Sequence, residues 1–154
     1  MAAYTDTLGF YKGSAAFGAF GDERFGFAEV ELDFAKIVAA RSAASATALT
    51  AADTLQVIQI PAGALMLAGG LNVVTAETTN TTATFDLGCT GGSPIAANAF
   101  CNDVASNAVA YSSTGLAAPV LFSSADTIDL LLNTAVPADA VVKVWALFFD
   151  VRPS

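Results

Sequence analysis

Apolar and polar residues alternate along several short stretches of the chain, which is the pattern of β-strands with one buried face. In the segment 29–34, Val30, Leu32 and Phe34 alternate with three acidic residues. These acids fit the solvated face of a strand better than a metal site, because no partner acids accompany them. We therefore predict a strand that has one face toward water.

Two longer apolar runs flank a tight turn near the middle of the chain. Residues 55–60 and 65–75 are rich in β-branched and aliphatic side chains, and Pro61-Ala62-Gly63 separates them. Proline fixes one turn dihedral and glycine supplies dihedrals that other residues avoid. The pattern predicts strand, turn and strand, with a bulge or bend at Gly69-Gly70 in the second strand.

The remaining apolar segments predict five further strands, at residues 82–87, 104–111, 119–122, 128–133 and 141–150. Both faces of the last strand are mostly apolar, and Trp145 and Phe149 lie on the same face. We expect it to be buried on both sides, by the core on one and by the arm or another subunit on the other. Residues 39–52 carry many serines and threonines and no apolar stripe, which favours a surface connection over a helix.

About eight short strands separated by turn residues predict an all-β protein, a jelly-roll-like antiparallel β-sandwich. A chain of 154 residues is expected to form one domain. We place this sandwich at residues 28–154 and assign residues 1–27 to an extended N-terminal arm that is rich in glycine and aromatic residues.

Neither a helical nor an alternating period fits the arm. The entropy cost of ordering its glycine-rich backbone offsets the gain from burying its aromatic side chains, so we expect it to order only against a docking surface. An irregular strand packed on the chain's own sheet is the open alternative. With two residues of the last strand, the arm aromatics are the predicted partner-binding residues: Tyr4, Phe10, Tyr11, Phe17, Phe20, Phe25, Phe27, Trp145 and Phe149.

Composition and charge narrow the classes of partner. The chain is 55% hydrophobic and only 13% charged, which suggests a surface partly covered by other subunits. Abundant alanine is the alternative explanation, because it also raises the hydrophobic percentage. The net charge is −8 and the six basic residues are scattered, so we expect no nucleic-acid partner. We expect no membrane partner either, because no apolar run is long enough to span a bilayer. The N-terminus lacks a secretory pattern, and we expect the protein to stay in its host cell unless it leaves within a larger assembly.

The residues offer little catalytic chemistry. The sequence contains no histidine, which removes the commonest general acid or base and the commonest zinc ligand. Its serines have no accompanying base, and aspartates such as Asp86, Asp103 and Asp126 fit turn positions. We therefore predict no enzymatic activity, no metal and no cofactor.

Cys89 and Cys101 flank a long loop. They are too few for a zinc site. A disulfide between them would close a loop of about 13 residues and contribute roughly 3 kcal/mol. Two independent buried thiols are the alternative, and the sequence leaves both possibilities open.

Four segments together are similar to a known protein family: Val30 to Ile37, Asp53 to Gly63 with its Val-Ile-x-Ile-Pro-Ala-Gly stretch, Asp126 to Leu130, and Val144 to Leu147. The chain resembles small structural proteins of tailed bacteriophages, particularly those of cyanobacterial and marine hosts. Some of these are capsid decoration (cement) proteins, and others are virion components. The resemblance covers roughly residues 29–151 and does not extend to the arm or to the cysteine-flanked loop.

The resemblance implies a β-sandwich, often a homotrimer, on the capsid exterior where major capsid proteins meet. We accordingly expect a decoration protein that is assembled in the host cytoplasm and stabilises contacts between capsomers, with the phage major capsid protein and its own copies as partners. A tail, baseplate or fibre component is one alternative. A carbohydrate-binding module is another, and a hydrolase is a more distant one.

Overall fold

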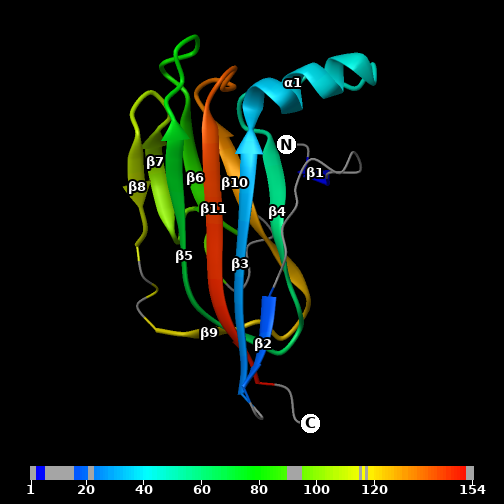
Figure 1. Ribbon diagram of the computed structural model, residues 1–154, viewed down its shortest axis with the longest axis vertical. Helices are drawn as coiled ribbons and strands as arrows, with labels where there is room; N and C mark the ends of the chain where they lie inside the picture. The colour runs from blue at the N-terminus through cyan, green and yellow to red at the C-terminus, as the bar shows by residue number, and fades with distance from the viewer. Residues whose placement is uncertain are drawn as a thin grey trace.

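The computed structural model describes residues 3–5, 16–20, 23–89, 95–114, 116 and 118–151. Two β-sheets pack face to face, and one helix lies at one end of the sandwich (Figure 1). The elements in chain order are β1 Ala3–Thr5, β2 Ala16–Phe20, β3 Glu23–Asp33, α1 Phe34–Ala43, β4 Thr54–Ile60, β5 Ala64–Thr75, β6 Thr84–Gly88, β7 Cys101–Ala105, β8 Ala110–Ser112, β9 Val120–Leu121, β10 Asp126–Asn133 and β11 Val141–Asp150. No helix in this described part of the chain is long and apolar enough to cross a membrane.

The strand order is that of a jelly roll. Sheet A runs β1-β4-β10-β6-β7, and sheet B runs β2-β3-β11-β5-β8 with β9 added to β5. Among the eight strands outside the arm and β9, the first pairs with the last (β3 with β11), and the next pairs inward are β4 with β10, β5 with β8 and β6 with β7. All four pairings are antiparallel, so the chain is one long antiparallel ribbon rolled into two sheets. The predicted fold class is confirmed.

The arm segments that the structure describes lie at the edges of both sheets. β1 pairs with β4 in parallel, unlike every other described pairing, and β2 pairs antiparallel with β3. β3 itself begins at Glu23, so this strand crosses the boundary that the sequence suggested between residues 27 and 28.

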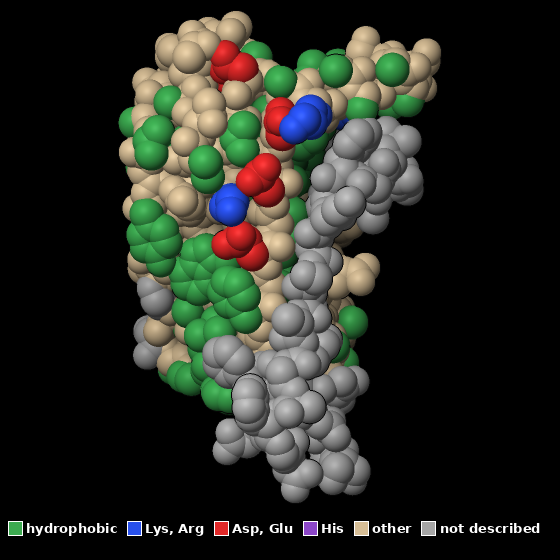
Figure 2. All heavy atoms as spheres, viewed as in Figure 1, with side chains coloured by type: hydrophobic (Ala, Val, Ile, Leu, Met, Phe, Trp, Pro, Cys, Tyr) green, Lys and Arg blue, Asp and Glu red, His purple; other side chains and the backbone are tan. Residues whose placement is uncertain are grey.

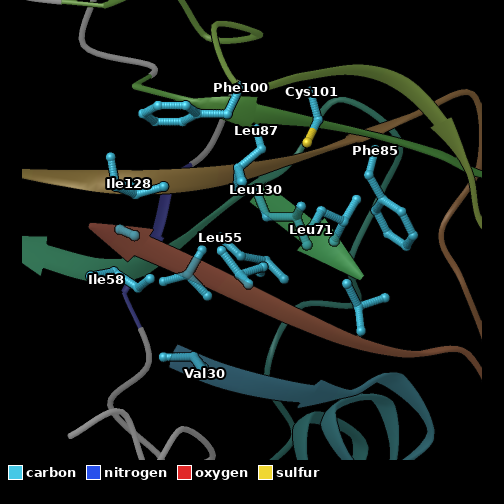
Figure 3. Packing of buried hydrophobic residues seen from close by; sticks show 14 of the residues in the cluster. Val30, Leu55, Ile58, Leu71, Phe85, Leu87, Phe100, Cys101, Ile128 and Leu130 are labelled. Atoms are coloured by element: carbon cyan, nitrogen blue, oxygen red, sulfur yellow. The ribbon is translucent and has the colours of Figure 1, made fainter. Parts of the chain in front are cut away.

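The core lies between the two sheets and is centred on β11. Its inward side chains, Val142, Val144, Ala146 and Phe148, are all fully buried. Figure 3 shows how Leu71 of sheet B meets Leu87 and Leu130 of sheet A in this space. The apolar residues that alternate along each strand therefore form one continuous core, as the sequence pattern predicted.

Helix α1 corrects the sequence analysis, which extended a strand to Phe34 and treated residues 39–52 as a surface connection. The Asp33 side chain accepts a hydrogen bond from the Lys36 backbone N–H at 3.1 Å and caps the helix. The hydrogen bond with the Lys36 side chain lowers the pKa of Asp33 below its ordinary value. Phe34 and Ile37 are buried against the core. A cap and two buried apolar residues thus suffice for a helix that has no broad apolar stripe.

Two segments in fact cross between the sheets: one was predicted as a single strand, and the other as the turn between two strands. The segment predicted as one strand at 104–111 is in fact β7 of sheet A followed by β8 of sheet B. The turn at residues 61–63 likewise joins β4 and β5, which lie in opposite sheets, so the predicted strand, turn and strand is not a paired hairpin. Gly63 has a φ of 84°, a backbone conformation that favours glycine. Alternation of side chains fixes which residues face the core but not which strands pair.

A buried carboxylate joins two loops near the helix end of the sandwich. Glu77 is only 2% exposed, and its Oε1 accepts hydrogen bonds from the backbone N–H groups of Thr79 and Asn80 at 3.0 and 2.8 Å. Its Oε2 accepts from the three successive amides of residues 138–140 at 2.7 to 3.1 Å. One side chain therefore fixes the turn after β5 to the loop that leads into β11.

Replacing this carboxylate should destabilise the fold. The substitution Glu77→Gln places an amide donor among five backbone donors, and we expect the free energy of unfolding to fall by about 2–4 kcal/mol. Urea denaturation monitored by circular dichroism measures it. The exposed Glu31→Gln is the matched control and should change the value by less than about 0.5 kcal/mol. Equal losses for the two variants would contradict this role of Glu77.

Candidate interaction surface

The outward face of sheet B is apolar at one end and charged at the other. Its rows follow the strand register: Glu31, Lys143 and Asn72 lie side by side near α1. Two rows further along, Phe27, Leu147 and Ala68 are neighbours, and the last row contains Phe149, Leu65 and Leu121. Figure 2 shows this division directly, with acidic and basic side chains above a contiguous band of hydrophobic ones.

Three aromatic rings form the centre of the apolar band. The Trp145 ring stacks with Phe27 on one side and with Tyr111 on the other, with centroids 6.4 Å apart in both pairs. The planes of Trp145 and Tyr111 differ by only 4°. Phe27 is 42% exposed and Tyr111 is 65% exposed. We call Phe27, Trp145 and Tyr111 the aromatic strip; it joins β3, β11 and β8 across the sheet.

Gly70 makes room for the strip. A Cβ atom at this position would lie 2.7 Å from atoms of the Trp145 ring, so the ring occupies the place of a side chain on β5. Gly69 points to the opposite face, where its Cβ would meet the Phe100 ring at 2.9 Å. Register shifts in β5 fall at Val74, between the partners of Val141 and Val142, and at Leu67, between the partners of Leu147 and Phe148. The prediction was a bulge or a bend at Gly69-Gly70, and the bulge is wrong in position, because both glycines pair regularly with β11. The two glycines accommodate rings.

The charged end of the face has more acid than base. Lys143 Nζ lies 3.3 Å from Glu29 Oε1 and 4.0 Å from Glu31 Oε2, so two carboxylates share one ammonium group. We call these three residues the charged rim. Glu29 pairs with Trp145 in the strand register, which places the rim directly beside the aromatic strip. Exposed ion pairs of this kind contribute little to stability.

The outward face of sheet A differs in character. Its outward positions on β4, β6 and β10 are mostly polar, and two of them, Thr54 and Asp129, are buried. With Leu131 as an apolar member, the other polar positions are Gln56, Gln59, Thr84, Asp86, Thr127 and Asn133. An apolar outer face is expected where another surface covers it, and a polar one where water does. Of the two outer faces, that of sheet B is therefore the candidate interaction surface.

The predicted partner-binding residues are distributed unevenly. Trp145, Phe149 and Phe27 lie on the outward face of sheet B, as predicted for the first two. By backbone position, Tyr4 is in β1, Phe17 and Phe20 are in β2, and Phe25 is in β3. Phe10 and Tyr11 lie outside the described residues. The sequence analysis missed Tyr111 and Leu121, because their strands had no feature that distinguished an outward aromatic or leucine from a core residue.

The two cysteines are free and buried, so the structure has no disulfide between them. Cys101 Sγ donates a hydrogen bond to the carbonyl oxygen of Ser112 at 3.2 Å. Burial, with smaller effects from Asp126 and Asp129, raises the pKa of Cys89 to about 12. Both thiols are therefore protonated and enclosed at neutral pH.

The acidic side chains near the loops have local partners. Asp86 accepts a hydrogen bond from the Asp103 backbone N–H at 2.7 Å, and Asp139 accepts one from the Thr78 backbone N–H at 2.8 Å. The hydrogen bond from the Thr78 hydroxyl lowers the pKa of Asp139 below its ordinary value. Within the described ranges, no group of three or more metal-binding side chains comes together.

The chain matches no family model and no curated protein. Three solved structures contain chains of similar fold. One is titled the acidic stable capsid structure of Helicobacter pylori bacteriophage KHP30, with a TM-score of 0.53, 14% identity and 94% of each chain covered. The cyanophage Pam1 capsid gives a TM-score of 0.52 and 20% identity over 88% of this chain and 90% of that one. The capsid of Ralstonia phage GP4 gives a TM-score of 0.50 and 14% identity, with 99% of this chain and 100% of that one covered. These similarities show a shared fold.

The thiols give a first test of the geometry at β7. Because burial and a raised pKa suppress the thiolate, we expect native protein to react negligibly with Ellman's reagent at pH 8. Unfolding in guanidinium without reductant should release both thiols at once. Finding no reactive thiol after unfolding would mean that the cysteines are bonded.

Trp145 is the only tryptophan, so its fluorescence reports on the aromatic strip alone. The substitution Gly70→Ala should push the ring off β5 toward water, and we expect the emission maximum to shift to longer wavelength. Gly69→Ala is the matched control: it acts on Phe100 in the core, and should lower the free energy of unfolding by about 1–3 kcal/mol without the emission shift. Identical emission for Gly70→Ala and the native protein would contradict the described ring position.

Proposed function

We propose that this chain is a bacteriophage capsid decoration (cement) protein, which binds the capsid exterior and stabilises contacts between capsomers. The observation that carries the proposal is the aromatic strip on the outward face of sheet B, within an apolar band that the sandwich itself leaves partly exposed. The near full-length similarity in fold to chains of three phage capsid structures supports the same assignment.

The strand geometry favours attachment through a sheet face over attachment through the β7 edge of sheet A or the β8 edge of sheet B. At the first of these edges, the pairing of β6 with β7 shifts in register between Phe85 and Leu87, and Asp103 has a φ of 50°. At the second, β8 is only three residues long. Irregular and short edge strands are poor templates for adding another strand. The apolar face is the better docking surface, and buried tryptophan and tyrosine are frequent anchors of interfaces.

The N-terminal arm and the oligomeric state complete the proposal. The arm aromatics add a second contact with the capsid, and the major capsid protein and further copies of this chain, as a homotrimer, are the partners. The acidic net charge of −8 opposes binding to nucleic acid and to anionic membranes. Cryo-microscopy of particles would distinguish this role from a tail, baseplate or fibre component, because it locates the sandwich on the head or on the tail.

Removing residues 1–22 of the arm should separate folding from attachment. Deletion of residues 1–22 leaves β3 and the complete antiparallel ribbon, so we expect a folded, soluble protein with a cooperative thermal transition. Its attachment to purified decoration-free particles, measured by co-sedimentation, should fall at least tenfold. Full-length protein is the control. Unimpaired attachment of the shortened chain would reject the role of residues 1–22.

A carbohydrate-binding module is a second candidate, because Trp145 and Tyr111 place two nearly parallel aromatic rings on the outer surface of sheet B. Sugar rings have apolar faces that lie well on such a surface, and Asn72 beside Tyr111 offers a hydrogen-bonding side chain. Binding of the isolated protein to a glycan array, with loss on Tyr111→Ser, would favour this function. Absence of binding to any glycan on the array would count against a carbohydrate-binding function.

A further inference from the structure

We infer that the outer edge of β4 is a strand-acceptor site, and that copies of this chain exchange β1 through it when they assemble. Each copy donates its β1 to the β4 edge of one neighbour and accepts the β1 of another. The inference rests on one part of the proposed function, the association of copies of this chain. It specifies which segment joins one copy to the next.

The edge of β4 has the features of a strand that accepts another strand. β4 contains no proline and no charged residue, which are common means of protecting a sheet edge. Its pairing with β10 shifts in register at Val57. β1 pairs with Thr54, Leu55 and Gln56 and ends beside this irregularity. The acceptor site therefore consists of these three residues, and the bulge next to them limits its length.

No short connection ties β1 to β4. Only residues 21 and 22 separate β2 from β3, so the chain itself brings these two antiparallel strands together. Parallel strands cannot be joined in this way, and β2, β3 and α1 all lie between β1 and β4 along the chain. Figure 1 shows β1 beside β4 near the helix end of the sandwich and β2 toward the opposite end. A β1 strand from another copy can therefore pair in the same register.

The pairing of β1 is short enough to be exchanged. Three residues, Ala3 to Thr5, take part, and parallel pairing is slightly less stable per residue than antiparallel pairing. Each backbone hydrogen bond adds only a small net stability, because water binds the same groups when the strands separate. Keeping β1 on its own sheet also restricts both ends of residues 6–15, which costs entropy. These backbone terms hold β1 only weakly on its own β4.

Exchange between copies uses the same pairing and closes in a ring. Donor and acceptor are different parts of the chain, so the contact is head to tail, and a closed ring fills every acceptor once. The proposed homotrimer is such a ring. Copies that already lie side by side present β1 at a high effective concentration, which favours exchange without any new contact. Each copy is then joined to its neighbours by one donated and one accepted strand, the mode known as strand addition.

Cysteines placed at a register pair test the exchange. Thr5 and Gln56 are partners in the pairing of β1 with β4. Neighbouring strands lie about 4.8 Å apart, within the Cα separation of about 4.4–6.8 Å that a disulfide spans. Full-length chains with only Thr5→Cys are co-expressed with size-tagged chains that have only Gln56→Cys, and are oxidised with copper phenanthroline. Non-reducing electrophoresis measures the mixed dimers.

Three controls accompany this measurement. Oxidised native protein checks that the two buried native thiols form no bond. In the collision control, tagged Asn102→Cys replaces Gln56→Cys, because Asn102 is exposed on β7 at the opposite edge of sheet A. A chain with both Thr5→Cys and Gln56→Cys checks the pairing itself. We expect at least tenfold more mixed dimer than in the collision control, and covalent multimers from the doubly substituted chain.

A second measurement needs no cysteine. Deletion of residues 1–5 removes β1 and leaves every other described strand. We expect the oligomer of this shortened chain to dissociate at a protein concentration at least tenfold higher than native protein does, as measured by sedimentation velocity. Unchanged dissociation would contradict the exchange.

The cysteine experiment decides the inference in each of its outcomes. If the doubly substituted chain forms its bond only within single chains, and mixed dimers do not exceed the collision control, β1 stays on its own sheet and the inference is wrong. If no variant forms a bond, β1 does not occupy the β4 edge, and the inference is wrong as well. Co-sedimentation of native protein with decoration-free particles tests the proposed function separately. Binding without exchange would reject only the inference, and exchange without binding would reject only the role on the capsid.

Discussion

Strand β11 is mostly apolar on both of its faces, and a two-sheet sandwich can cover only one of them. Side chains alternate along a strand, so Val142, Val144, Ala146 and Phe148 point into the core and are fully buried. Trp145, Leu147 and Phe149 alternate with them and face outward. The central position of β11 between β3 and β5 makes this outward set the middle of the outer face of sheet B. The candidate interaction surface is a direct consequence of this arrangement.

The neighbouring strands adapt to the large rings of β11 in the same way on both faces. On the core side, a Cβ atom at Gly26 of β3 would lie 2.5 Å from the Phe148 ring. On the outward side, Gly70 of β5 leaves the same kind of space beneath Trp145. Glycine in a strand lowers its stability, and close approach of another group is a recognised reason for it. A ring lying over a glycine fixes its position, which prepares the aromatic strip for contact before any partner arrives.

The sequence predicted the fold class and most strands, because alternation of apolar and polar residues is a local signal. It predicted the outward position of Trp145 and Phe149 for the same reason. Strand pairing was not predictable. The residues of the turn at 61–63 are compatible both with a turn between paired strands and with a connection that crosses between the sheets. Helix α1 was missed because its stability comes from the cap at Asp33 and from tertiary burial of Phe34. Tyr111 was missed because only the strand register brings it beside Trp145.

The proposed role as capsid cement joins these features, since a sandwich with one polar and one apolar outer face can bind a partner through the apolar one. The most direct measurement of this central claim is the accessibility of Trp145 before and after attachment. Protein labelled with 5-hydroxytryptophan can be followed selectively among unlabelled capsid chains. The account predicts that acrylamide quenches the free protein readily and the particle-bound protein several-fold less. Equal quenching in the two states would contradict it.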